Sequence, residues 1–242
     1  MEMHKPKLVA NWRELLKEWG VIVLGVLTAL LAEQAVESIQ WHHKVNAAVA
    51  DMNNELSVGD GPQSYVRAAM HDCIADRLDM ARSAVERGDR AEARKLIDTF
   101  WLPKRTWDSL ARDAATASDI ASHMPHQRML QYRIAYNMVP DMQRLADKEL
   151  ADLANLRALP SSGGPIEAPE KRPEIEAIEA LRIDNGAIGR EAMFTLVRLK
   201  LMDLRIDRFS VARDFVAART HFSSCMTTPR LPAADRAGLN RF

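Results

Sequence analysis

Apolar residues are concentrated in one segment near the N-terminus, and the rest of the chain has helical periodicity. The segment from Val21 to Ala32 contains no charged residue, and Trp19 and Trp41 flank this segment and its more polar continuation. These two tryptophans are 22 residues apart, or about 33 Å along an α-helix. Because this distance matches a bilayer with an aromatic residue at each interface, the pattern predicts one transmembrane helix over residues 19–41.

Three other interpretations of the same segment remain open. A cleaved signal peptide would combine a basic start, this apolar run and a small-residue cleavage site, although Leu30-Leu31-Ala32 is a poor site. A run of 12 apolar residues also suits a buried helix of a soluble protein. A helix lying flat on the membrane surface would need a polar face, which residues 21–32 lack.

Basic residues are concentrated on the N-terminal side of the predicted helix. They are Lys5, Lys7, Arg13 and Lys17, whereas only Lys44 occurs between Trp41 and Gly61. Because basic flanks favour the cytoplasmic side, residues 1–18 are predicted to be cytoplasmic and the chain beyond Trp41 extracytoplasmic. In a Gram-negative bacterium the helix would span the inner membrane and the bulk of the chain would lie in the periplasm.

One side of the predicted helix carries small and apolar residues at coiled-coil spacing. This seam consists of Ile22, Gly25, Ala29, Ala32 and Val36, at intervals of three and four residues. Gly25 and Ala29 also form a pair of small residues four positions apart, which lets two helix backbones approach closely. We therefore expect the seam to contact other transmembrane helices, from a second copy of the chain or from a larger membrane complex.

The outer third of the predicted helix is polar. Glu33, Gln34 and Glu37 lie at the expected outer interface, where charges should face a partner helix, lipid headgroups or water. These residues either make polar contacts with a partner helix or simply mark the end of the apolar core. The helix contains no histidine, so ligation of haem by the span is not expected.

Residues 42–226 are predicted to form one extracytoplasmic all-α domain, a bundle of long helices. Ala, Leu, Arg, Asp, Glu and Met are abundant there, and no alternating strand pattern occurs. Gly88 should end one helix, and Asp89 with Glu92 resembles a capping box that begins the next. The first helix should continue to about residue 56 and be followed by a turn at 57–62. Further helices are expected at 62–87, 90–101, 106–123, 125–159 (with a kink at Pro140) and 173–222. An exposed loop is expected at 159–173 and an irregular tail at 227–242.

Cys73 and Cys225 are the only cysteines, one on a helix face and the other beyond the last long helix. An oxidising compartment permits a disulfide between them, and we expect this disulfide to tie the end of the chain to the first helices of the domain. The alternative is two unpaired cysteines, with Cys73 packed as a small hydrophobic residue.

Charge and composition argue against several functions. The 33 basic and 33 acidic residues balance, which is atypical of a protein that binds nucleic acid. Two zinc-ligand pairs are conceivable, His71 with Cys73 and His123 with His126, but neither comes with a convincing second pair. No phosphate-binding loop, dinucleotide fingerprint or hydrolase motif occurs. The sequence therefore predicts no catalytic residue, metal or cofactor.

The N-terminal segment resembles a bacterial membrane anchor. An aromatic-x-Glu start at residues 12–14 leads into Val21–Leu30, whose core has the form GVLxAL, and a polar helical stretch then ends at Trp41. This pattern is similar to the N-terminal anchor of uncharacterised single-pass inner-membrane proteins of bacteria. The resemblance covers about the first 45 residues. It implies an inner-membrane anchor followed by an extracytoplasmic helical domain, and it implies no activity.

These observations favour a non-enzymatic single-pass membrane protein. It would act as an accessory, scaffold or assembly subunit, in contact with the lipid bilayer and with other transmembrane helices through the seam. The main alternative is a periplasmic ligand-sensing or solute-binding helical domain, which would need a cavity with convergent polar groups. An enzyme with an unusual site is a third possibility and would need a cleft with a perturbed acid–base pair.

Overall fold

The computed structural model describes residues 12–103, 106–159, 163–222, 225–226 and 229. Within these ranges every regular element is a helix and there is no strand, which confirms the all-α prediction. The chain forms two compact units, residues 1–47 and 48–242. The tail predicted at residues 227–242 lies outside the described residues except for Pro229.

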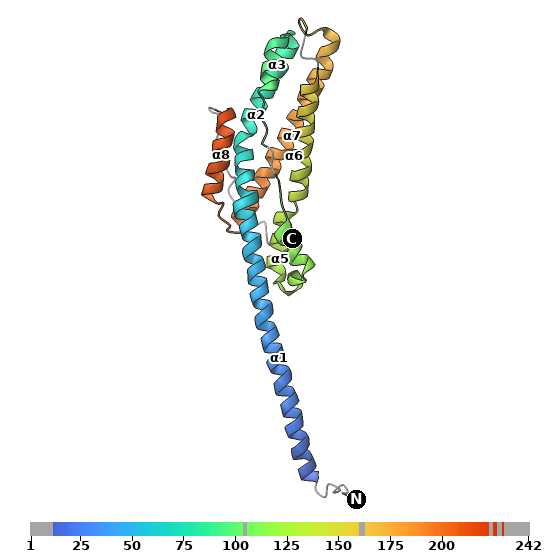
Figure 1. Cartoon of the computed structure of the whole chain (residues 1–242), viewed down its shortest axis with the longest axis vertical. Coiled ribbons are helices and arrows are strands. Elements are labelled where there is room, and N and C mark those ends of the chain that lie inside the picture. The colour runs from blue at the N-terminus through green and yellow to red at the C-terminus, as the bar shows by residue number, and fades with distance from the viewer. Residues whose placement is uncertain (1–11, 104–105, 160–162, 223–224, 227–228, 230–242) are drawn as a thin grey trace, which may run out of the picture. The chain divides into compact units, whose positions relative to one another are not determined.

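The first unit is a single stretch of helix over its described residues. Helix α1 (Trp12–Asn54) contains the whole predicted span, and its last residues belong to the second unit. It is uninterrupted because Leu, Ala and Val are abundant and proline is absent. The Thr28 hydroxyl donates to the carbonyl oxygen of Leu24 at 2.7 Å, so this polar group is satisfied within the helix (α1 in Figure 1).

The turn predicted at residues 57–62 is wrong. The chain instead passes from α1 through a π-helical turn, η1 (Glu55–Asp60), into α2 (Gly61–Arg87). Pro62 lies in the first turn of α2, where proline is tolerated because the first N–H groups of a helix have no partner within it.

Gly61 serves close packing rather than a turn. Its dihedral angles, φ −62° and ψ −54°, are those of an α-helix. A Cβ atom at this position would lie 2.7 Å from the carbonyl oxygen of Leu56 and 2.9 Å from Leu199 Cδ1. Both distances are too short for carbon, so only glycine allows this approach.

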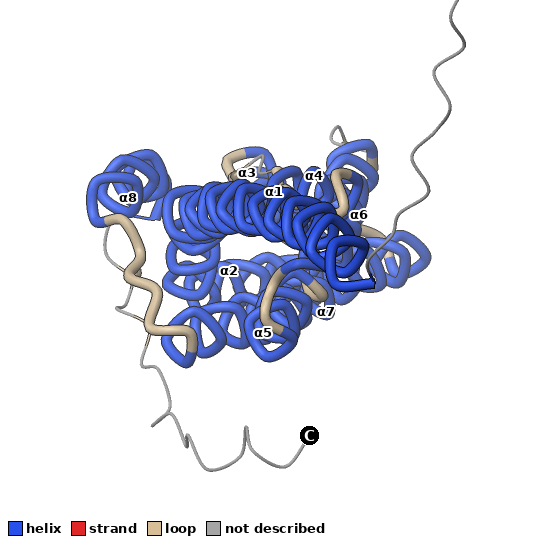
Figure 2. Tube along the Cα trace, turned by 90° about the horizontal axis from the view of Figure 1, so that it is seen from below, coloured by secondary structure: helices blue, strands red, loops and turns tan. Residues whose placement is uncertain are grey.

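The second unit is built around α2. Helices α3 (Arg90–Asp98), α7 (Ala168–Leu201) and α8 (Arg208–Phe222) pack against α2, and α6 (Val139–Ala158) packs against α7. Helices α2 and α7 run alongside each other (Figures 1 and 2). Their contact lies in the main apolar core, which includes Met70, Ile74, Leu78, Ile178 and Leu181. Burial of such side chains is the largest favourable contribution to folding.

Helix α2 ends and α3 begins as the sequence predicts. Gly88 adopts a left-handed conformation, φ 78°, and its N–H bonds back to the carbonyl oxygens of the last turn of α2. The Asp89 side chain then accepts a hydrogen bond from the N–H of Glu92 at 3.0 Å and caps α3. Helix α3 ends at Asp98, three residues before the predicted end.

Two predicted helices are each divided in the structure. Residues 106–123 hold α4 (Leu110–Ala117) and a 3-10 helix (Ile120–His123), with Asp119 left-handed between them at φ 61°. Residues 125–159 hold α5 (His126–Tyr136) and α6, rather than one helix kinked at Pro140. Pro140 lies in the first turn of α6, so it helps to begin a helix instead of bending one.

The loop predicted at residues 159–173 is too long, because α7 already begins at Ala168. Glu167 and Glu170 form a reciprocal capping box, in which the N–H of Glu167 donates to Glu170 Oε2 at 2.9 Å. Pro169 is in the first turn and Pro173 is accommodated inside the helix. The cap therefore decides where the helix starts, in spite of the prolines.

The helix predicted at residues 173–222 is two helices, α7 and α8. Between them Asp203 adopts a left-handed conformation, φ 59°. Asp207 then accepts a hydrogen bond from the N–H of Ser210 at 2.7 Å, which caps α8. The break lets the chain reverse, so that α8 packs on α2.

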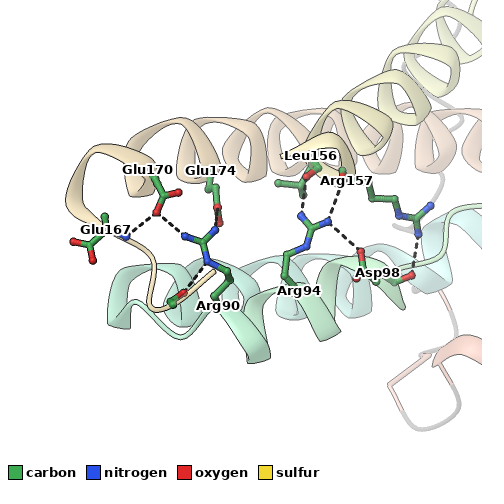
Figure 3. Close-up of polar contacts among 9 residues, drawn as sticks. Arg90, Arg94, Asp98, Leu156, Arg157, Glu167, Glu170 and Glu174 are labelled. Carbon is green, nitrogen blue, oxygen red and sulfur yellow. Dashed lines mark hydrogen bonds and ion pairs between the residues drawn. The ribbon is translucent and has the colours of Figure 1, made fainter. Parts of the chain in front are cut away.

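Two arginines of α3 join it to α6 and α7 (Figure 3). Arg94 donates to the carbonyl oxygens of Leu156 at 3.4 Å and Arg157 at 2.9 Å, in the last turn of α6, where carbonyl oxygens have few partners within the helix. Arg90 pairs with Glu170 at 2.6 Å in the first turn of α7. Positive charge at a helix C-terminus and negative charge at a helix N-terminus are both favourable.

The contact between α2 and α7 predicts opposite effects for two glycines of α7. A Cβ atom at Gly189 would lie 2.5 Å from His71 Nδ1, whereas at Gly186 the nearest atom is Nη1 of the flexible Arg190 at 3.5 Å. Gly189→Ala should lower the free energy of unfolding by about 1–3 kcal/mol through overpacking. Gly186→Ala should raise it by up to about 1 kcal/mol, because alanine favours helix.

Urea unfolding of the full chain in detergent, followed by circular dichroism, measures both changes. Equal stability of the two variants would contradict the close packing inferred at Gly189.

Candidate membrane anchor and disulfide

Helix α1 exposes nearly all of its large apolar side chains between residues 12 and 39. Among the described residues it is the one helix long and apolar enough to cross a membrane, and none of its apolar window is buried. Trp19 is 65% exposed and Leu24 is 67% exposed. The other exposed large apolar side chains of this stretch are Val21, Ile22, Val26, Leu27, Leu30 and Leu31. Exposure of this much apolar surface to water is unfavourable, which makes α1 the candidate anchor.

The seam residues are all exposed on α1. They are Ile22, Gly25, Ala29, Ala32 and Val36. A Cβ atom at Gly25 would meet nothing within 4 Å, so the small side chain there leaves open space along the helix. The seam is therefore available to a second helix, as its spacing predicts.

The polar residues beyond the apolar stretch contact the second tryptophan. Glu33, Gln34 and Glu37 are exposed. The Trp41 indole N–H donates to Glu37 Oε1 at 3.3 Å, and Lys44 Nζ lies 4.4 Å from the centre of the Trp41 ring. The Trp41 side chain therefore contacts a charged group at its N–H and another at one ring face. Such an environment is typical of a tryptophan at the interface between a membrane and water.

Cys73 and Cys225 are joined by a disulfide. Their sulfur atoms are 2.15 Å apart and their Cα atoms 5.4 Å apart. Cys73 is buried within α2, and Cys225 follows α8. Phe222, one turn before Cys225, packs edge-to-face on Phe100 with ring centres 6.5 Å apart. The disulfide thus fastens α8 to α2, at the helix pair expected from the sequence.

A buried ion pair between α2 and α6 was not predicted. Arg67 donates to Glu149, and their side chains are only 2% and 6% exposed. Burial lowers the pKa of Arg67 and raises the pKa of Glu149, in spite of their mutual attraction. The available signal was the charge of Glu149 at helical spacing from Met142, Leu153 and Leu156, which are all buried.

Lys148, the neighbour of Glu149, joins α6 to α7. Its Nζ donates to Asp184 Oδ2 at 2.8 Å and to Asp152 Oδ2 at 2.7 Å. These hydrogen bonds raise the pKa of Lys148, whereas burial raises the pKa of Asp184. Successive charged residues of α6 therefore bind two different helices, which fixes the rotation of α6 about its axis.

The structure does not bring together the conceivable zinc ligands. Cys73 is in the disulfide, and the His71 ring packs against Gly189. His123 ends the 3-10 helix and His126 begins α5. Within the described ranges no three His, Cys, Asp or Glu side chains are placed to hold a metal ion.

No family model, curated protein or solved structure matches the chain. The resemblance of the first 45 residues to bacterial single-pass anchors therefore stays a prediction.

The disulfide should contribute strongly to stability, because it closes a loop of 152 residues. The chain-entropy model gives about 5 kcal/mol for such a loop. We expect reductant to shift the urea midpoint of the full chain in detergent to lower concentration. A Cys73→Ser/Cys225→Ser variant should be less stable than the oxidised protein and insensitive to reductant. Equal midpoints for oxidised and reduced wild type would contradict this role.

Proposed function

We propose that this protein is a single-pass membrane protein whose helical domain lies on the extracytoplasmic side, as an accessory, scaffold or assembly subunit. The observation that carries the proposal is the run of exposed apolar side chains on α1 between Trp19 and Trp41. Each fully buried side chain of this kind gains about 1.5–3 kcal/mol on leaving water. Lipid can bury all sides of such a helix at once.

Two observations support the orientation. Basic residues precede the span, and after Trp41 only Lys44 occurs before Gly61, which favours a cytoplasmic N-terminus. The disulfide lies beyond the span, and disulfides persist in oxidising compartments such as the bacterial periplasm.

The seam supports an assembly role. Its small residues let a second helix approach closely, and Glu33, Gln34 and Glu37 follow as polar groups that a partner could satisfy. Either a second copy of the chain or a transmembrane helix of a larger complex would fit this face. A ligand-sensing domain is the second candidate, and it is favoured by a pocket in the second unit that Asp51, Glu55, Asp60 and Asp108 line.

The anchor proposal predicts that the protein resists extraction of native membranes with alkaline carbonate. It also predicts that a phosphatase fused after Phe242, which is active only outside the cytoplasm, is active in cells. The same fusion without residues 1–41 is the control and should be soluble and inactive. Release by carbonate, or an inactive full-length fusion, would contradict the anchor or its orientation.

The seam predicts that added bulk on one side of α1 disrupts self-association. Gly25→Leu/Ala29→Leu should weaken dimerisation of the full chain in detergent at least tenfold in a resonance energy transfer titration, because the helix backbones can no longer approach. The matched variant Val23→Leu/Leu27→Phe adds bulk about 160–200° from Gly25 and should change little. The assembly role of the seam would be contradicted if two results were found together. The wild type would be monomeric at all concentrations, and affinity purification would recover the same membrane partners with the seam variant as with the wild type.

A further inference from the structure

The second unit contains an acidic pocket of about 380 Å³. It is formed by the end of α1, by η1, and by the segment that leads into α4. Four carboxylate side chains line it, those of Asp51, Glu55, Asp60 and Asp108. No Lys, Arg or His is among its described lining residues. Its volume is within the range of small-molecule sites.

Asp60 is the residue that points to a ligand. Its side chain is 2% exposed and lines the pocket. Oδ1 accepts a hydrogen bond from the N–H of Asp108 at 3.4 Å, whereas Oδ2 has no hydrogen-bond partner within the described part of the chain. Buried carboxylate oxygens nearly always have a donor, because a missing hydrogen bond costs about 1–3 kcal/mol.

The π-helical turn places a second carboxylate beside Asp60. In η1 the hydrogen bonds run from residue i to residue i+5, which brings Glu55 and Asp60 to the same side of the turn. In an α-helix two residues five apart would be about 140° apart. Glu55 Oε2 also accepts a hydrogen bond from the N–H of Ala111 at 2.9 Å, which holds it at the pocket.

The charge of the pocket and its geometry limit the class of ligand. Four carboxylates favour a cation, and no metal-binding group of three such side chains exists among the described residues. An ammonium or guanidinium group needs no coordination sphere of fixed geometry, because each N–H makes a separate charge-assisted hydrogen bond.

We propose that this pocket binds a small organic cation, a diamine or a guanidinium compound, whose cationic group pairs with the Asp60 carboxylate. This inference names a ligand class for the second candidate function, ligand sensing. It does not depend on membrane topology, because all of the lining residues belong to the second unit.

The affinity should depend on pH through Asp60. Burial raises the pKa of Asp60 to about 7, the N–H of Asp108 opposes this, and the nearby carboxylates of Glu55 and Asp108 add to the rise. The Tyr136 hydroxyl is near Glu55 and Asp60, and burial raises its pKa. The Arg112 guanidinium lies over the Tyr136 ring, 5.5 Å from its centre, and Asp51 is the remaining carboxylate of the pocket lining. Below about pH 7 the cation must displace a proton from Asp60, so the affinity should fall about tenfold between about pH 8 and about pH 6.

Isothermal titration calorimetry of the full chain in detergent and phosphate buffer tests the proposal, with 1,4-diaminobutane and agmatine as probes. We expect saturable binding of at least one probe, no binding of uncharged 1,4-butanediol, and no competition by Mg²⁺. Asp60→Asn keeps the acceptor for the Asp108 N–H but removes the charge, so it should weaken binding at least tenfold and abolish the pH dependence. Asp76→Asn changes an exposed carboxylate of α2 that is not at the pocket and should leave binding unchanged.

Three outcomes would overturn the proposal. The first is the absence of saturable binding of either probe by the wild type. The second is equal affinity of wild type and Asp60→Asn while both are folded by circular dichroism. The third concerns Lys104 and Arg105, which precede the pocket residue Thr106 in the sequence and lie outside the described residues. If the Lys104→Gln/Arg105→Gln variant binds a probe and the wild type does not, a basic side chain of the protein itself neutralises the pocket in place of a ligand.

Discussion

The packing of three helices around α2 is the constraint on which the helical domain depends. Helices α3, α7 and α8 all contact α2, and 13 of its 27 residues are buried. Its buried side chains accordingly include Ser64 and Arg67 as well as apolar residues. Arg67 finds its partner on another helix, α6, and a buried charge of this kind constrains where that helix can pack.

The ion pair of Arg67 and Glu149 shows what this requirement costs. The pKa directions of both groups show that loss of water outweighs their mutual attraction. Such a pair adds little to net stability, but either charge left alone would be strongly destabilising. The pair therefore selects one arrangement of α6 on α2, and Lys148 with Asp184 does the same for α6 on α7.

Features that depend on a few adjacent residues could be predicted from the sequence. Gly88 and Asp89 fix the junction of α2 and α3 because a left-handed glycine and an aspartate cap act locally. The length and apolar character of the N-terminal helix likewise follow from composition alone. The sequence also identified the two cysteines that the structure joins, because the chain offers no other pairing.

The errors have two causes, contacts made only in the folded chain and local signals that other residues obscured. Gly61 and Pro62 predict a turn, but Gly61 lies inside a helix where a Cβ atom would be too close to the Leu56 carbonyl oxygen and to Leu199 of α7. The start of α7 was misplaced because nearby prolines obscured a local signal, the capping box of Glu167 and Glu170. The pocket was missed because Asp108 lies 48 residues beyond Asp60 and only the folded chain brings them together.

Membrane anchoring and cation binding place separate demands on this chain. The span requires residues 21–32 to be apolar on all sides of the helix, whereas the pocket requires carboxylates further along the chain, at Asp51, Glu55 and Asp60. The whole chain has no net charge, with 33 basic and 33 acidic residues, so any attraction of a cation comes from the local field of the carboxylates that line the pocket. Selectivity must then arise within the pocket, where partial exclusion of water strengthens the attraction between a carboxylate and an ammonium group. The buried position of Asp60 supplies this condition, and an exposed cluster with the same charge would not.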